Sequence, residues 1–198
     1  MNFDTLQALD ERITLAINSL HFEAGDHFWQ FFSSAEVWFP MYAAVLFMMV
    51  WRLGWKKGLV AVMAMVLTVI ACDQIAGLVK ELVRRLRPCY NTDMVTAGLH
   101  MLEGRGGYYG FFSGHAANAF GFAAASAICF EADKNHRYEV YQWFIFIWAA
   151  LVSLSRIFAG KHYFGDVVVG AIVGFIIGCA IAMSFRRVVT RTGWSSPS

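Results

Sequence analysis

Long apolar stretches separated by short polar segments dominate this sequence. Five of them are long enough to cross about 30 Å of hydrocarbon as helices. They occupy residues 36–55, 58–79, 115–131, 141–157 and 166–185. The third stretch is rich in alanine and glycine, and in the fifth Gly170, Gly174 and Gly178 recur on one helical face. Small residues let helices approach closely in lipid, so the pattern predicts an all-α integral membrane bundle with the third helix near its centre.

Residues 1–35 follow a different pattern. Apolar residues recur at helical spacing through the first twenty positions, with Asp10 and Glu11 on the other side, which predicts an amphipathic helix at the membrane interface. Residues 22–34 are rich in aromatic side chains and predict a second short interfacial helix, or else a sixth span. We expect one domain, divided into interfacial helices (1–35), a transmembrane core (36–185) and a cytoplasmic tail (186–198).

Composition supports the membrane assignment. Of the 198 residues, 58% are hydrophobic and only 15% are charged, whereas soluble domains are about 45–50% apolar. The net charge of +2 is too small to indicate a nucleic-acid partner. The four cysteines form no CxxC motif, so we expect no disulfide, metal site or cofactor. His100 and His136 stand alone in the sequence and are interpreted as solvated.

Three short clusters carry the candidate chemistry. They read Lys80-x6-Arg87-Pro88, Ser113-Gly114-His115 and Ser155-Arg156-x5-His162-x3-Asp166. Their cations could neutralise phosphate oxygens. A hydroxyl and the amides at a helix N-terminus could donate hydrogen bonds to the same oxygens. Two imidazoles could serve for covalent attack and proton transfer. Together the clusters predict one phosphate site.

Each cluster also has a structural interpretation. Lys80 and Arg87 share one helical face with Arg84, but cations that flank a span are common and extend their side chains to the interface. Arg84 and Arg85 are interpreted as such flanking charge. Asp73, inside the second span, is either a functional carboxylate or a structural hydrogen-bonding group.

The second and third clusters have alternatives of the same kind. Ser113 could be a helix N-cap. Asp166 could fix the tautomer of His162 by accepting a hydrogen bond from it, or it could cap the last span. The glycine-rich run 104–110 is interpreted as a flexible lid or linker, with direct phosphate contact as the alternative.

The order of the spans places all three clusters on the same side of the membrane. The first lies where span two ends, the second where span three begins, and the third between spans four and five. Eight basic residues flank the spans on the opposite side: Arg52, Lys56, Lys57, Lys134, Arg137, Arg186, Arg187 and Arg191. The cluster side carries seven, of which three belong to the clusters. Outside the motifs, eight basic residues on the opposite side therefore stand against four on the cluster side. This excess predicts that the opposite side is cytoplasmic and that the site faces the periplasm or outside.

The clusters resemble the three motifs of the type 2 phosphatidic acid phosphatase family: KxxxxxxRP, PSGH and SRxxxxxHxxxD. The resemblance covers about residues 72–178, and Phe112 departs from it by replacing the usual proline. It implies that His162 is a nucleophile forming a phosphohistidine, that Asp166 orients it, and that His115 protonates the leaving oxygen. It further implies phosphate binding, without a metal, by Lys80, Arg87, Ser113, Gly114 and Arg156.

We therefore expect a metal-independent lipid phosphatase in a bacterial inner membrane, with a lipid phosphate substrate and membrane lipids as its partners. By resemblance, undecaprenyl diphosphate ranks first among substrates, ahead of phosphatidylglycerol phosphate, phosphatidic acid and the lipid A phosphates. Vanadate-dependent haloperoxidases have a similar phosphate pocket but are soluble and larger. A non-catalytic lipid binder or transporter is the other alternative. The sequence leaves the oligomeric state open.

Overall fold

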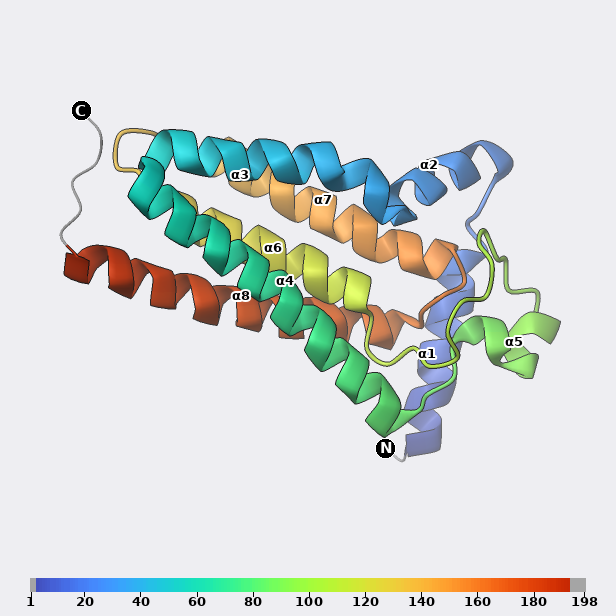
Figure 1. Cartoon of the computed structure of the whole chain (residues 1–198). Coiled ribbons are helices and arrows are strands. Elements are labelled where there is room, and N and C mark those ends of the chain that lie inside the picture. The colour runs from blue at the N-terminus through green and yellow to red at the C-terminus, as the bar shows by residue number, and fades with distance from the viewer. Residues whose placement is uncertain (1–2, 193–198) are drawn as a thin grey trace.

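The computed structural model describes residues 3–192 and is a helical bundle (Figure 1). Five long helices run side by side: α3 (Phe39–Leu53), α4 (Trp55–Val83), α6 (Gly114–Phe130), α7 (Glu139–Phe158) and α8 (Phe164–Thr192). The predicted all-α membrane bundle is confirmed. Four helical segments are long and apolar enough to cross a membrane: Ala35–Leu53, Trp55–Val83, Glu139–Phe158 and Phe164–Arg191. Residues 193–198 of the expected tail lie outside the described part of the chain.

Helix α6 is the central element that the sequence predicts. Its 17 residues coincide with the expected third span, and nearly all its side chains are buried, because α4, α7 and α8 pack around it. A Cβ added at Gly174 of α8 would lie only 2.0 Å from the carbonyl oxygen of Ala117. Cβ atoms at Gly170 and Gly178 would come within 2.5 Å and 2.4 Å of backbone oxygens in the same segment. The predicted close packing of the glycine face is confirmed.

The amphipathic helix α1 (Phe3–Asn18) lies across one end of the bundle (Figure 1). It turns polar side chains toward the protein. Thr14 Oγ1 accepts a hydrogen bond from the Phe164 N–H (2.9 Å), and Asp10 Oδ1 accepts one from the Gly165 N–H (2.7 Å). These amides open α8 and have no partner within their own helix. Leucines on the other face of α1, such as Leu6, stay exposed, as a helix at a membrane interface requires.

Helix α2 (Glu23–Ser33) has 11 residues, which span about 17 Å at 1.5 Å per residue. It is too short to cross the hydrocarbon region and packs against α7 instead. The 3-10 turn η1 (Ala35–Trp38) joins it to α3. Between α4 and α6 the chain forms the turn η2 (Pro88–Tyr90) and the short helix α5 (Thr92–Thr96). These elements gather with α1 at one end of the bundle (Figure 1).

Candidate active site

The three predicted clusters meet at the end of the bundle that α1 covers. The C-terminal ends of α4 and α7 and the N-terminal ends of α6 and α8 all reach this end. The Ser113 N–H donates to the backbone oxygen of Asp166 at 2.9 Å, which joins the starts of α6 and α8. A Cβ on Gly114 would lie 3.5 Å from Lys80 Nζ. Four predicted site residues lie within electrostatic range of His115: Lys80, Arg87, Arg156 and His162.

His162 is buried in the short connection between α7 and α8, with 2% of its surface exposed. Its Nδ1 lies 3.5 Å from Asp166 Oδ2, an ion-pair distance longer than an ordinary hydrogen bond. Burial lowers the pKa of His162 to about 4, although Asp166 acts in the opposite direction. The imidazole is therefore neutral near pH 7, the form that a nucleophile needs.

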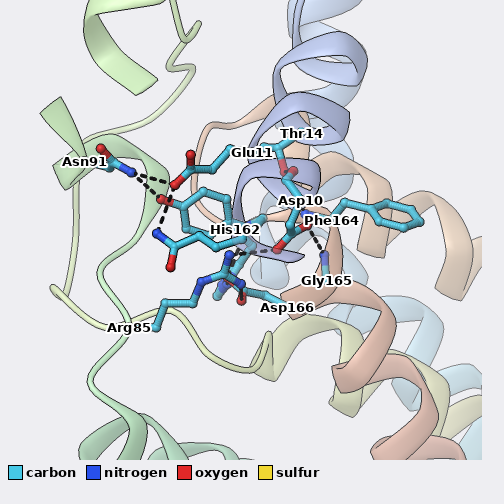
Figure 2. A network of polar contacts seen from close by, with 11 residues as sticks. Asp10, Glu11, Thr14, Arg85, Asn91, His162, Phe164, Gly165 and Asp166 are labelled. Carbon is cyan, nitrogen blue, oxygen red and sulfur yellow. Dashed lines mark hydrogen bonds and ion pairs between the residues drawn. The ribbon is translucent and has the colours of Figure 1, made fainter. Parts of the chain in front are cut away.

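Asp166 is fully buried and contacts both the start of α8 and the His162 ring. Its Oδ2 accepts a hydrogen bond from the Tyr163 N–H at 3.1 Å, as a capping side chain at the start of α8 does. The same oxygen is the one nearest His162. Its Oδ1 accepts a hydrogen bond from Arg85 at 2.7 Å. The carboxylate is therefore held on both sides next to the imidazole (Figure 2).

Arg85 is not flanking charge, and that interpretation is wrong. Its guanidinium joins Asp166 to Asp10, at 2.7 Å and 2.8 Å (Figure 2). It also lies 3.9 Å from the ring centre of Tyr163. Burial disfavours the charge, but the two carboxylates more than compensate and raise the pKa of Arg85. No local spacing reveals this contact, since Asp10 lies 75 positions away. Arg84 is exposed and donates to a backbone oxygen of α4, as flanking charge can.

Ser33 and Glu103 offer acceptor oxygens to Arg156, the cation at the end of α7. Arg156 is 5% exposed and donates to the backbone oxygen and hydroxyl of Ser33. Its Nη1 also lies 3.4 Å from Glu103 Oε1. Lys161 donates to the Gly104 carbonyl and lies 3.9 Å from Glu103 Oε2. Burial lowers the pKa of Lys161, and Glu103 partly offsets this. The sequence motifs identify neither acceptor.

The glycine-rich run is attached to the site. The Arg87 N–H donates to the Tyr108 oxygen at 2.9 Å, and Arg87 Nε donates to the Tyr109 oxygen at 3.2 Å. Gly106 has a positive φ of 66°, and a Cβ there would lie 3.5 Å from both Arg87 Nη1 and Lys161 Nζ. The positive φ favours glycine at this position beside the two cations. This part of the loop is therefore attached to Arg87 in the structure, and whether it moves as a lid stays a prediction.

Phe112, which replaces the usual proline of the family motif, lies just before the start of α6. Phe112 is 3% exposed and packs among Cys72, Ala76 and Ala117, between α4 and α6. The side chain that departs from the family motif therefore fills the apolar core beside the site. Ser113 Oγ accepts from the Ala116 N–H at 3.4 Å, so the N-cap interpretation holds.

Asp73 is exposed on α4, within electrostatic range of Lys80. His100, by contrast, is not a lone solvated histidine. Its ring stacks on that of His21, and its Nε2 lies 2.9 Å from Asp26 Oδ2.

The fold and the site define a multi-pass membrane protein with cationic, histidine and carboxylate side chains gathered at one end of a helical bundle. The profile of the PAP2 superfamily matches residues 58–189. The chain belongs to this family of type 2 phosphatidic acid phosphatases and is a membrane lipid phosphatase.

Two curated relatives match most of the chain. A lipid A 4'-phosphatase of Bacteroides thetaiotaomicron is 36% identical over 97% of this chain and 84% of its own length. A lipid A 4'-phosphatase of Porphyromonas gingivalis is 32% identical over 86% of this chain and 70% of its own length.

Solved structures show the same fold. A PAP2-type phosphatidylglycerolphosphate phosphatase from Bacillus subtilis gives a TM-score of 0.74 at 19% identity, covering 96% of this chain and 90% of that one. LpxE of Aquifex aeolicus gives a TM-score of 0.61 at 22% identity, covering 87% of this chain and 93% of that one. Because the chain belongs to a phosphatase family and resembles lipid A 4'-phosphatases over most of its length, the alternative of a non-catalytic lipid binder or transporter is set aside.

Proposed function

We propose that this protein removes a phosphate from lipid A, at the 4' position. The observation that carries the proposal is the similarity of nearly the whole chain to a lipid A 4'-phosphatase. A second relative with the same name supports it. Undecaprenyl diphosphate, the first-ranked substrate from sequence, finds no support among these relatives. The lipid A alternative takes its place.

In the first chemical step, His162 Nε2 attacks phosphorus, and the bond between phosphorus and the sugar oxygen breaks. Asp166, next to Nδ1, keeps the proton on that nitrogen and leaves Nε2 free to attack. The contact of 3.5 Å shortens as the imidazole gains positive charge, because catalytic hydrogen bonds are often long before substrate binds. His115 donates a proton to the leaving sugar oxygen. The products of this step are the dephosphorylated lipid and a phosphohistidine.

In the second step, water attacks the phosphohistidine and gives a proton to His115. The bond from phosphorus to Nε2 breaks, and inorganic phosphate leaves. Five groups stabilise the charge on the phosphate oxygens in both steps: Lys80, Arg87, Arg156, the Ser113 hydroxyl and the Gly114 amide. Catalysis of this kind depends on positioning and electrostatics, and fixed cations take the part that metal ions have in other phosphotransferases.

We further propose that the site faces the periplasm. The excess of basic residues at the opposite end of the bundle, eight against four outside the motifs, supports this orientation. A reporter fused to the C-terminus is then active in the cytoplasm. A periplasmic C-terminus would contradict the assignment.

A substrate panel on the purified protein tests the proposal. We expect hexa-acylated bis-phosphorylated lipid A to lose one phosphate, and mass spectrometry of the fragmented product to show that the 1-phosphate is retained. Undecaprenyl diphosphate and phosphatidylglycerol phosphate are the competing substrates. A kcat/KM for either that exceeds the value for lipid A would refute the substrate assignment. The His162→Ala variant separates true turnover from a contaminating phosphatase, because it forms no labelled phosphohistidine.

A further inference from the structure

Three potential metal ligands from separate segments lie together beside the active site. His21 follows α1, Asp26 is in the first turn of α2, and His100 lies in the loop after α5. One ligand atom from each lies within 4.8 Å of the others. Imidazole nitrogens and a carboxylate oxygen are common ligands of zinc. The expectation of no metal site followed from spacing along the sequence, which could not reveal this group because its members are distant in the chain.

Two contacts hold the three side chains together, and the stacked histidine rings turn apart when both bind one ion. His100 Nε2 and Asp26 Oδ2 are 2.9 Å apart, a hydrogen-bond distance. The rings of His21 and His100 are stacked, with 3.6 Å between their centres. The second oxygen of Asp26 is buried and has no hydrogen-bond partner among the described residues. A buried carboxylate oxygen without a partner is costly, and a bound cation would relieve that cost.

The backbone holds His100 in place. Asn18, buried in the last turn of α1, accepts a hydrogen bond from the His100 N–H at 2.8 Å and donates one to its carbonyl at 3.0 Å. The same amide group donates to the carbonyls of Ile157 and Phe158 in α7. The loop is therefore anchored at His100, and little ordering is needed before a metal binds there.

We propose that His21, Asp26 and His100 bind a divalent transition-metal ion of the zinc type, with water completing the coordination. The ion takes the place of the hydrogen between His100 Nε2 and Asp26 Oδ2, so the bound His100 ring carries its hydrogen on Nδ1. The site is separate from the phosphate-binding cations and supplies no group to the reaction. Its ion links the α1–α2 connection to the loop that carries Glu103, three residues beyond His100, and Glu103 contacts Arg156 and Lys161. The ion therefore fixes the loop beside the active site.

Metal binding to the full-length protein in detergent tests this proposal directly. We expect one Co²⁺ per chain, seen by its ligand-field absorption, and competition by Zn²⁺ in a calorimetric titration. His100→Gln and Asp26→Asn each weaken binding by at least about tenfold, as loss of a ligand or its support does. His21→Gln should also weaken metal binding by at least about tenfold. This variant is the test to use if His100→Gln and Asp26→Asn fail to fold.

His136→Gln is the matched control. His136 also contacts a carboxylate, Asp133, at 2.8 Å, but Arg52 lies 2.8 Å from its other nitrogen in place of a further ligand. We expect this variant to bind metal as the unaltered protein does. Zn²⁺ should also slow proteolysis of residues 97–110 in the unaltered protein and not in His100→Gln. Absence of stoichiometric binding, or the same affinity in His100→Gln, would overturn the proposal without affecting the lipid A assignment.

Discussion

Arg85→Met tests whether a residue outside the three motifs positions the catalytic pair. The guanidinium donates one charge-assisted hydrogen bond to each of two carboxylates, Asp166 and Asp10. Methionine keeps the apolar stem and removes both bonds. Among the described residues, Asp166, which is 0% exposed, then keeps the Tyr163 N–H as its hydrogen-bond donor and the His162 nitrogen at 3.5 Å.

The size of the effect follows from these contacts. A hydrogen bond to a charged group contributes about 1.5–3 kcal/mol. The Arg85 side chain is 21% exposed and Asp10 is 15% exposed, so solvent screening favours the lower end of this range. Two bonds then give about 3 kcal/mol. Because Asp166 both starts α8 and orients His162, we expect part of this to appear as a lower Tm and part as a lower kcat, by about 10- to 100-fold.

Single-turnover kinetics separates positioning from folding. We expect phosphohistidine to form more slowly in Arg85→Met per folded molecule, with KM little changed, because substrate contacts remain. Arg85→Lys should recover part of the rate, since an ammonium group reaches only one carboxylate well. Arg84→Asn is the control: Arg84 is exposed with a φ of 53°, a conformation that asparagine tolerates. An Arg85→Met enzyme with kcat within about threefold of the unaltered protein would refute the reasoning that assigns Arg85 to positioning.

Further predictions concern packing, protonation and metal removal. Gly174→Ala should greatly lower Tm in detergent because its Cβ would lie 2.0 Å from a carbonyl oxygen, whereas Gly77→Ala in α4, where nothing lies within 4 Å, should leave Tm unchanged or raise it. Since burial lowers the pKa of His162 to about 4, the nucleophile stays neutral down to about pH 5. Acidification from pH 7 should then reduce kcat/KM through protonation of the substrate phosphate, near pH 6, and not through protonation of His162; an additional loss centred near 6.5, in a titration fitted with two ionisations, would contradict this. EDTA should leave most lipid A hydrolysis intact, and a tenfold loss restored by Zn²⁺ would show that the reaction needs the metal.

The sequence predicts the bundle and the motif groups because their signals are local or periodic. Span three is recognisable from its small residues, and the glycines of span five mark the face that contacts it. Contacts between distant segments leave no such signal. Nothing near Arg85 indicates Asp10, and nothing near Arg156 indicates Ser33, because the fold alone brings these residues together. The amphipathic pattern of α1 predicts a helix, but it does not reveal that the polar face caps α8.

Residues of α1 and α2 support the site although they lie outside the matched family profile, which begins at residue 58. Asp10 and Thr14 satisfy the amides that open α8, and Ser33 accepts from Arg156. The groups assigned to the chemistry all fall within the profile. The lipid A 4'-phosphatase relative from Bacteroides, by contrast, is similar over 97% of the chain. The supporting segment is therefore shared with this relative, and substitutions in α1 and α2 should alter how firmly the common groups are held rather than the reaction they perform.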